Sequence, residues 1–539
     1  MRAIPIGTAG LLVAAAVIIP TSVLGLVQGP TRAGGPAATA PVPDTPALKP
    51  LARITAPGRT CESLLGLSLP DTVIESATVE AAQGAAPALC RVTAVVTHPP
   101  ANDKVRVFLA FPMTGWNGRF QGIGGGGFSG GNAMSVRAPA ASGFAAGSTD
   151  TGHEGGSGSF ALDAATNRLN WMLIRDNAYL GIHDMTVTGK AVTQALYGAP
   201  PVKSYFNGCS TGGRQGQSEA QRYPADYDGI LSGAPAINWT KLHVEQLWGH
   251  LVMTTTNTIV PQCKFQAATA AAVAACDALD GVTDGVLEDP RRCTYDPKAL
   301  VGTTTGNCGT ITDADANVIR KIWEGPRRRD GSFLWYGLSR GAAFNGLSNT
   351  GGTPLTSQPN GITLDWWRFF LMQNPAWSPA GLSHAAYEQA WDQSVEQYGP
   401  VFATDSPNLS AFRARGGKIV MWHGQNDQLI YPGGSIDYYE RVQREMGGAR
   451  PTAEFMRFFL APGVAHCNGG PGPQPTGHFE ALIKWVEEGA APDTLLAVRR
   501  DSSGLVTRSR PLCQYPLVAR YRGTGSTDEA ANFTCASGF

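Results

Sequence analysis

The sequence predicts an α/β fold, in which a mostly parallel sheet is flanked by helices and interrupted by a large insertion. Up to residue 237, short apolar segments typical of buried strands alternate with segments of helical periodicity. From residue 238 to residue 399 this alternation stops, and Ala-rich helical stretches, cysteines and aromatic clusters follow one another. Apolar strands return with the letters KIVMW from Lys418 and FMRFFL from Phe455. The chain therefore divides into a first sheet half (56–237), an insertion (238–399) and a second sheet half (400–539).

Length and charge limit the classes of protein that fit. A chain of 539 residues exceeds one simple core, which favours a large domain with an insertion, or two to three domains. Lys and Arg together number 42, as do Asp and Glu, so the formal net charge is zero. Nothing in this balance suggests a nucleic acid or an anionic membrane as a partner.

The N-terminus has the pattern of an export signal. Arg2 precedes an apolar run over residues 4–27, and no charged cluster that would stop transfer through a membrane follows. The run is interrupted by Gly7, Gly10, Pro20 and Gly25. A cleaved signal peptide (1–30) is therefore favoured over a single membrane anchor. The Ala-, Pro- and Thr-rich residues 31–55 are expected to form a disordered linker, and the mature protein is expected to be secreted.

The first sheet half begins with two predicted antiparallel strands, at residues 91–97 (RVTAVVT) and 105–111 (VRVFLAF). Four glycines, residues 124–127, then follow a strand, and glycine lets a backbone approach a ligand closely. Residues 179–197 have helical periodicity, and a further buried strand is expected near residues 227–232. This order of elements is that of β-α-β units in a parallel sheet.

Residues 208–212 (GCSTG) have the form Gly-x-Ser-x-Gly, between a predicted buried strand (202–206) and a predicted helix (213–223). In this setting the two glycines permit a sharp turn that raises the Ser210 hydroxyl above the sheet, where it can act as a nucleophile. The alternative is a glycine-rich turn in which the serine has no chemical role.

Two further polar residues follow strands of the second sheet half. Asp427 lies just after KIVMW, where an acid that orients a histidine is expected, and His466 lies in the loop after FMRFFL, where the general base is expected. The alternatives are a solvated turn aspartate and a loop histidine packed under the surface. Ser210, Asp427 and His466 stand in the chain order of the α/β-hydrolase fold, which we therefore predict. The long stretch between the serine and the aspartate supports a large inserted lid domain at 238–399.

These residues predict acyl-transfer chemistry at an ester. The histidine would take the proton of the serine hydroxyl as it attacks an ester carbonyl, and the aspartate would fix the tautomer of the imidazole. The oxyanion of the tetrahedral intermediate needs preorganised N–H donors. We expect one donor from the backbone of Thr211 and the other from the glycine run, at Gly126 or Gly127.

The sequence holds ten cysteines, an even number that suggests disulfides in an exported protein. No Cys-x-x-Cys pair occurs, so a zinc or redox site is not expected. Cys209 precedes Ser210 and Cys467 follows His466, so a formed triad would bring the two cysteines close. A Cys209–Cys467 disulfide would then join the nucleophile to the base covalently. The alternative is two buried free thiols.

Three motifs resemble the tannase and feruloyl esterase family: GCSTGGRQG around Ser210, HGxxD ending at Asp427, and GVxHC around His466. The resemblance runs from about Cys61 to Cys535, nearly the whole predicted mature chain. It implies a secreted serine esterase that acts on esters of aromatic acids, of the feruloyl, galloyl or terephthalate monoester type. The partner that it implies is a small aromatic ester or an ester of plant cell wall or polyphenol, with no nucleic acid and no stable membrane partner.

The resemblance also implies a structural calcium ion in the lid. The matching carboxylates and carbonyl groups belong to Asp277, Asp280, Val282, Asp284 and Val286. Oxygen atoms at this short spacing can surround a hard cation. From the spacing alone, a loop of Asx turns is an equal alternative.

The same resemblance implies further disulfides besides Cys209–Cys467, namely Cys61–Cys90, Cys276–Cys293 and Cys513–Cys535. The last of these would link an otherwise irregular C-terminal tail. The family usually has another local pair just after the calcium loop, but Cys308 has no near partner here. Cys263 is also left over, so these two either pair with each other, as we predict, or stay free.

Aromatic side chains are frequent in the predicted lid, and we expect the lid to supply the pocket for the acyl group. They are Trp335, Tyr336, Trp366, Trp367, Phe369, Phe370 and Trp377. The majority are expected to form the core of the lid itself. Arg368 lies among them and could meet a carboxylate or phenolate, although a solvated arginine is the commoner case.

Two other classes of function stay open. A lipase or general carboxylesterase would use the same triad under exposed apolar lid helices, and some chains with this fold are non-catalytic binding proteins. The calcium loop and the cysteine framework argue against a lipase. The presence of all three triad residues argues against a binding protein.

Overall fold

A computed structural model describes residues 48–538. The predicted signal peptide (1–30) and most of the predicted linker (31–55) lie outside this range. The linker residues that the structure does describe, 48–55, contain no helix or strand. Within the described range, no helix combines the length and the apolar character needed to cross a membrane.

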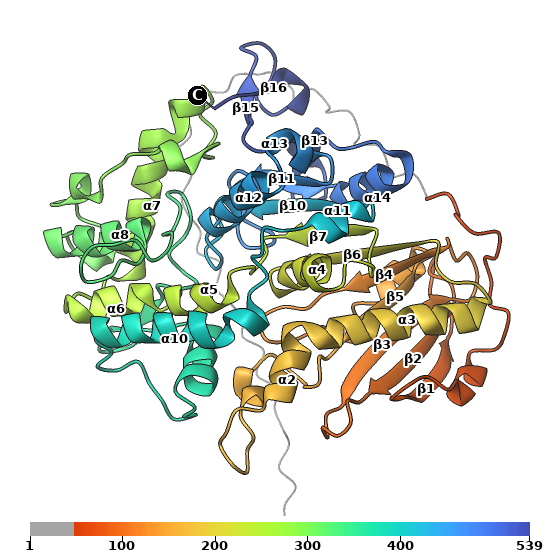
Figure 1. Cartoon of the computed structure of the whole chain (residues 1–539). Helices are drawn as coiled ribbons and strands as arrows, with labels where there is room; N and C mark the ends of the chain where they lie inside the picture. The colour runs from red at the N-terminus through yellow and green to blue at the C-terminus, as the bar shows by residue number, and fades with distance from the viewer. Residues whose placement is uncertain (1–47, 539) are drawn as a thin grey trace, which may run out of the picture. The chain divides into compact units, whose positions relative to one another are not determined.

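A nine-stranded mixed sheet forms the centre of the fold, which confirms the predicted α/β class (Figure 1). Its strand order is β1-β2-β3-β5-β4-β6-β7-β10-β11. The pairs among β1, β2, β3 and β5 are antiparallel, and every later pair in this order is parallel. The strands are β1 (Thr72–Glu80), β2 (Leu89–Val96), β3 (Val105–Pro112), β4 (Arg119–Ile123), β5 (Ala145–Thr149), β6 (Lys203–Cys209), β7 (Gly229–Gly233), β10 (Lys418–Gly424) and β11 (Met456–Ala461).

The two sheet halves contain helices that flank this sheet or adjoin its end, as α2 (Trp171–Arg175) does. The others are α1 (Arg137–Ala141), α3 (Gly181–Tyr197), α4 (Thr211–Arg222), α11 (Ser410–Ala414), α12 (Gly433–Glu445), α13 (Ala449–Ala453) and α14 (His478–Glu488). The helix predicted over 179–197 is α3, preceded by a π-helical turn, η3 (Asp176–Leu180). α3 approaches the sheet closely, because a Cβ atom on Gly189 would lie 2.6 Å from the Phe120 ring.

The insertion folds as a helical lid beside the sheet (Figure 1). Its helices are α5 (Trp239–Glu245), α6 (Trp248–Thr255), α7 (Gln262–Cys276), α8 (Asp313–Glu324), α9 (Gly361–Asp365) and α10 (His384–Phe402). A second π-helical turn, η8 (Trp366–Leu371), follows α9, and a small hairpin pairs β8 (Thr350–Gly351) with β9 (Thr356–Ser357).

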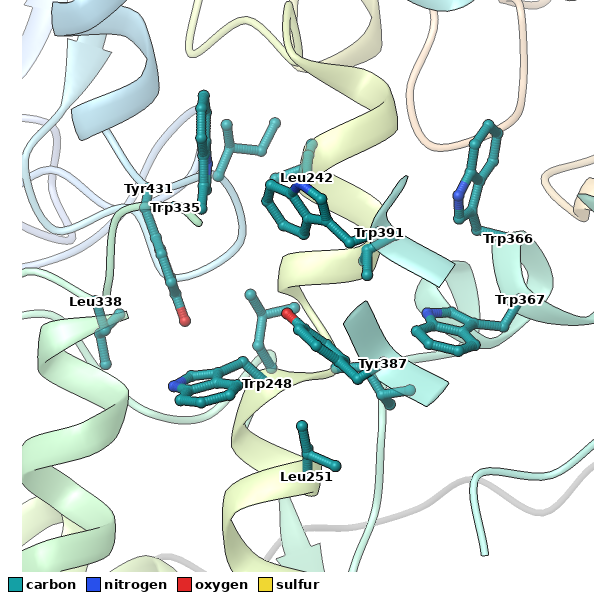
Figure 2. Close-up of a cluster of buried hydrophobic side chains, with 14 of the residues drawn as sticks. Leu242, Trp248, Leu251, Trp335, Leu338, Trp366, Trp367, Tyr387, Trp391 and Tyr431 are labelled. Carbon is teal, nitrogen blue, oxygen red and sulfur yellow. The ribbon is translucent and has the colours of Figure 1, made fainter. Parts of the chain in front are cut away.

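Most of the lid aromatics form a core of their own, as the sequence led us to expect (Figure 2). Trp366, Trp367 and Phe370 are each 0% exposed, and burying one such side chain stabilises the fold by about 2–3 kcal/mol. The Trp366 ring lies 4.4 Å from the Phe370 ring. Phe370 in turn stacks on Phe128, which directly follows the glycine run, at 5.6 Å. The lid core therefore continues to the edge of the candidate site.

The C-terminal tail differs from the expected irregular structure. Between Cys513 and Cys535, where irregular structure was expected, the chain forms β15 (Val518–Tyr521) and most of β16 (Phe533–Ala536). Before this stretch, β12 (Gln474–Thr476), β13 (Thr494–Arg500) and β14 (Val506–Cys513) form a three-stranded sheet. β15 and β16 pair antiparallel, and the Cys513–Cys535 bond joins β16 to the end of β14. Phe533 is buried with Val282 of the predicted calcium loop, and this burial, which the tail sequence does not reveal, orders the hairpin.

The ten cysteines form five disulfides, and no cysteine in the described range is free. The pairs are Cys61–Cys90, Cys209–Cys467, Cys263–Cys308, Cys276–Cys293 and Cys513–Cys535. They are the five pairs expected from the sequence and the family resemblance.

Candidate active site

Ser210 occupies a sharp turn between β6 and α4. Its backbone has φ 64° and ψ −124°, a conformation that side-chain-bearing residues rarely adopt. The turn needs glycine before the serine, because a Cβ atom on Gly208 would lie 2.4 Å from the carbonyl carbon of Gly212, and a Cβ atom on Gly212 would lie 3.2 Å from the Gly125 carbonyl oxygen. Ser210 lies at the end of the central strand β6 and lines an open pocket, so its hydroxyl is presented to a ligand.

Asp427 and His466 meet beside this turn. His466 Nδ1 lies 2.8 Å from Asp427 Oδ2, and the N–H groups of Leu429 and Ile430 donate to Asp427 Oδ1 at 2.9 and 2.8 Å. Burial alone would raise the pKa of Asp427. The charge of His466 and hydrogen bonds from His423 and His466 outweigh it and hold the pKa well below its usual range. The carboxylate is therefore ionised and can stabilise an imidazolium.

His423 is a second histidine on the same carboxylate, and its role was not foreseen from the sequence. Its Nε2 lies 3.1 Å from Asp427 Oδ2 and 2.8 Å from the Ile430 carbonyl oxygen, so this nitrogen carries the proton. Its Nδ1 then accepts from the Ser435 hydroxyl at 2.9 Å. The sequence signal for this contact was the i, i+4 spacing of His423 and Asp427 in the HGxxD motif. In the structure, His423 is a second side chain that holds the Asp427 carboxylate in place.

A disulfide joins the nucleophile turn to the loop of the base. Cys209 and Cys467 have Cα atoms 6.0 Å apart, and each is the chain neighbour of a predicted triad residue. His466 Nε2 lies 3.7 Å from Cys467 Sγ, on the side of the imidazole away from Asp427. Ser210 and His466 both line the same pocket, so Nε2 is the ring nitrogen available to a substrate and to the serine.

Hydrogen bonds hold the glycine run, residues 124–127, against the first turns of α4. The Thr211 hydroxyl donates to the Gly127 carbonyl oxygen at 2.6 Å. Gln215 Oε1 accepts from the Gly125 N–H at 3.0 Å, and the Gly212 N–H donates to the Gly125 carbonyl oxygen at 3.0 Å. Thr211, Gly126 and Gly127, the predicted oxyanion donors, all line the pocket with Ser210. The role of Gln215 was not predicted from the sequence, in which the only signal for it is its position one turn after Thr211.

The pocket has a volume of about 400 Å³, within the range of small-molecule sites. The residues that line it are mostly apolar and come from both sheet halves and from the lid. The lining residues are Gly125, Gly126, Gly127, Cys209, Ser210, Thr211, Ala236, Trp239, Leu242, His243, Gln246, Asn360, Ile362, Leu429, Ile430, His466 and Cys467.

One side of the pocket carries neutral polar groups. Burial lowers the pKa of His243 to about 3, so this imidazole is uncharged at neutral pH. Gln246 Oε1 accepts from the Thr363 hydroxyl at 2.9 Å and lies 3.1 Å from His243 Nδ1. The Gln246 amide also donates to the Leu429 carbonyl oxygen at 3.0 Å, which fixes its orientation.

The seven lid aromatics named from the sequence do not line this pocket. The aromatic ring that does is Trp239, at the start of α5. Arg368 also lies outside the pocket lining, and its Nε donates to the Trp377 carbonyl oxygen at 3.0 Å. The sequence could not show which aromatic side chains line the pocket and which pack in the lid core. The π turn η8 buries both Trp366 and Trp367, although they are adjacent in the chain.

The predicted calcium residues lie in one loop after α7, and most of them surround one small cavity. Asp280, Val282, Asp284 and Val286 line a space of about 20 Å³, enough for one ion or water, together with the unforeseen Glu288. Burial, with the charge of Asp284, raises the pKa of Asp280 to about 6.

The same loop also makes the Asx turns that were the alternative. Asp280 Oδ1 accepts from the Val282 N–H at 2.8 Å, and Asp284 Oδ1 accepts from the Val286 N–H at 3.1 Å. Asp277 does not line the cavity, since both its carboxylate oxygens contact the Gly285 N–H. The two descriptions are compatible at Asp280, whose turn uses one carboxylate oxygen, whereas the second oxygen of Asp284 already pairs with Arg508 and Arg510.

Comparisons with known proteins match most of the chain. A family model described as tannase and feruloyl esterase matches residues 90–536. A probable feruloyl esterase of Arthroderma benhamiae is 41% identical over 466 residues, covering 84% of this chain and 86% of the relative. The mono(2-hydroxyethyl) terephthalate hydrolase of Piscinibacter sakaiensis is 30% identical over 545 residues, covering 86% and 87%. The crystal structure of feruloyl esterase B from Aspergillus oryzae superposes with a TM-score of 0.78 at 28% identity, covering 88% of this chain and 99% of that one.

Proposed function

Because the chain belongs to the tannase and feruloyl esterase family of carboxylic ester hydrolases, we propose that it is a secreted serine esterase that cleaves esters of aromatic acids. One observation carries the proposal. Ser210 and His466 open into the same largely apolar pocket, and His466 Nδ1 lies 2.8 Å from the buried Asp427 carboxylate. Serine acyl transfer requires a histidine that an acid orients and that opens into the same site as the serine.

In the proposed reaction the Ser210 hydroxyl oxygen bonds to the ester carbonyl carbon, and its proton passes to His466 Nε2. Asp427 holds the Nδ1–H and stabilises the imidazolium. The N–H groups of Thr211 and of Gly126 or Gly127 stabilise the oxyanion. The imidazolium then protonates the leaving alkoxide as the C–O bond breaks, which leaves an acyl enzyme. Water, deprotonated by His466, releases the aromatic acid and restores the Ser210 hydroxyl.

The neutral polar side of the pocket supports a hydroxylated or methoxylated aromatic acid of the feruloyl or galloyl type. Trp239, Leu242 and Ile362 offer apolar surface to a ring, and the amides of Gln246 and Asn360 can hydrogen-bond phenolic or methoxy oxygens. A terephthalate monoester carries a carboxylate, and burying it favours a cationic partner. No Lys or Arg is among the residues lining this pocket.

The test is hydrolysis by the purified mature protein of methyl ferulate, methyl gallate, mono(2-hydroxyethyl) terephthalate and a long-chain p-nitrophenyl ester. We expect turnover of the first two, with the terephthalate ester slower, and loss of all turnover in Ser210→Ala with an unchanged circular dichroism spectrum. Turnover of the long-chain ester alone would make the protein a lipase. No turnover of any of the four would refute the proposal for these acyl groups, and would leave a non-catalytic binding protein or an esterase for a different acyl group.

Secretion is supported by the five disulfides, which form and persist in oxidising compartments. N-terminal sequencing of the protein recovered from a culture supernatant would test it. A mature start near residue 30 is expected, whereas an intact N-terminus in the membrane fraction would contradict secretion.

We further propose that the loop after α7 holds calcium. Asp280 and Asp284 would contribute carboxylate oxygens, Val282 and Val286 carbonyl oxygens, and Asp277 would support the loop through the Gly285 N–H. The ion would have a structural role, because its positive charge would offset the negative charges of these carboxylates. Arg508 and Arg510 of β14, which contact Asp284 at 3.1 and 2.6 Å, would connect the loop to the tail.

A further inference from the structure

A group of one histidine and three aspartates lies outside the catalytic pocket and outside the proposed calcium loop. His98 and Asp103 belong to the loop between β2 and β3, Asp176 begins the π turn η3, and Asp184 lies in α3. One donor atom from each of His98, Asp103 and Asp176 lies within 4.8 Å of the other two. Three segments distant in sequence therefore direct metal-binding side chains to one point.

The contacts around His98 are close on both sides of the ring. Its Nδ1 lies 2.6 Å from Asp103 Oδ2 and 3.9 Å from Asp176 Oδ1, and its Nε2 lies 3.2 Å from Asp184 Oδ2. A fully protonated imidazole carries one positive charge, which leaves the charge of three nearby carboxylates incompletely balanced. Arg106, a cation in the same region, contacts Asp150 at 3.5 Å and Glu154 at 2.9 Å instead.

The burial of Asp176 independently indicates that these side chains bind a cation. Its side chain is 0% exposed, and neither carboxylate oxygen has a hydrogen-bond partner among the described residues. A buried carboxylate without a partner is costly unless a cation or a proton compensates it. Its Oδ1 is directed at the His98 ring, toward the point where Asp103 also converges.

We propose that His98, through Nδ1, Asp103 and Asp176 bind one divalent transition-metal ion of the zinc and manganese class, while Asp184 contacts the opposite nitrogen of the ring and orients the imidazole. An imidazole nitrogen combined with carboxylate oxygens suits these ions, whereas calcium prefers oxygen ligands alone. The His98 and Asp184 side chains are 24% and 11% exposed, so an ion can reach the site from solvent. The cysteine spacing gave no reason to expect zinc, and no cysteine takes part in this site.

The ion would fix a turn that supports the active site. Asn177, the residue after Asp176, donates from Nδ2 to the Phe128 carbonyl oxygen at 2.8 Å and to the Thr151 hydroxyl at 3.1 Å. Phe128 directly follows the glycine run that lines the pocket. Binding of the ion therefore connects the β2–β3 loop, the π turn and the loop beside the nucleophile.

The test is zinc titration of the whole mature protein, stripped of metal and then kept in excess calcium so that the proposed lid site stays filled. Calorimetry should show one saturable zinc equivalent, and zinc should raise Tm by at least about 2 °C. Asp176→Asn and His98→Gln should each lose that equivalent while keeping the circular dichroism spectrum. Asp163→Asn, at an exposed turn, should keep it.

Three outcomes would overturn the proposal. One is a wild-type protein without a saturable zinc equivalent, another is its retention in both variants, and the third concerns a second group of side chains. A neighbouring group, His183, Glu219 and Asp226, also has converging donor atoms. Loss of the zinc equivalent in Asp226→Asn, with retention in Asp176→Asn, would move the ion there and refute the assignment. These readouts do not depend on ester turnover, so a failure of the proposed function stays distinguishable.

Discussion

Asp427 uses both carboxylate oxygens as acceptors, two backbone N–H groups on one and two histidines on the other. Asp427→Asn keeps the shape of the side chain but directs an amide N–H at an imidazole nitrogen, which favours the wrong tautomer of His466. We expect kcat for methyl ferulate to fall about 10⁴-fold with little change in KM. Steady-state kinetics with an unchanged circular dichroism spectrum would check this.

Asp437→Asn is the matched control, because this carboxylate on α12 pairs with Arg441 and is partly exposed. Its kcat should stay within the error of wild type. Equal losses in both variants would mean that the Asp427 effect comes from general destabilisation.

His243 predicts a dependence of stability on pH. Burial lowers its folded-state pKa to about 3, whereas an unfolded histidine titrates near about 6.5. Between these values the unfolded chain binds a proton that the folded chain does not, so the stabilisation is complete above the unfolded pKa and is lost as pH falls. The unfolding free energy of wild type, minus that of His243→Gln, should fall by up to about 1.4 kcal/mol per unit from pH about 6 to 4.

Urea unfolding of both proteins across this pH range measures the difference directly. His384→Gln, at a partly exposed position in α10, is the control and should leave the curve of wild type unchanged. Parallel curves for wild type and His243→Gln would show that the buried imidazole accepts a proton in the folded state.

At the scale of elements, α4 orders the glycine loop through side chains of its first two turns. Thr211→Val keeps the volume but removes the hydrogen bond to the Gly127 carbonyl oxygen. If this bond contributes about 1 kcal/mol to holding the glycine loop in its catalytic position, its loss should lower kcat roughly 5- to 10-fold, while Tm changes little. Kinetics of Thr211→Ser, which retains the hydroxyl, should resemble wild type, and an equal loss in Thr211→Ser would contradict the role of this bond.

The sequence predicts elements whose signals are local, and it misses contacts between distant ones. The glycines around Ser210 and the loop positions of Asp427 and His466 follow strands, so each could be recognised from a short stretch. The bond from Gln215 to the Gly125 N–H joins residues 90 positions apart, and no local pattern encodes it. The pocket wall was missed for the same reason, since only packing decides that Trp239 faces the ligand while Trp366 faces the lid core.

At the scale of the molecule, the disulfides constrain loops of very different length. Cys209–Cys467 spans 258 positions and Cys513–Cys535 spans 22. In the chain-entropy model, replacing the first pair by alanines should cost roughly 5 kcal/mol and the second roughly 3 kcal/mol. Urea unfolding of the two double variants would check the order, and an equal or reversed cost would show that native-state strain dominates.

Calcium removal should weaken the contact between lid and tail rather than the chemistry. Chelation is expected to lower Tm by a few degrees, since the carboxylates around the cavity lose the cation that offsets their mutual repulsion, while kcat at room temperature stays near its starting value. Calcium alone should restore Tm in wild type but not in Asp280→Asn. If calcium also restored the Tm of this variant, the loop after α7 would not be the calcium site.

The disulfide between the nucleophile turn and the base loop has a topological consequence. With residues 209–467 it forms a covalent ring, and the whole lid lies within that ring. A protease cut at an exposed lid loop, such as residues 301–304, opens the ring without releasing a fragment. The nicked chain should migrate as one species on a gel until a thiol reductant is added. Digestion within the lid and separation of Ser210 from His466 are therefore distinct chemical events, the first needing a protease and the second a reductant as well.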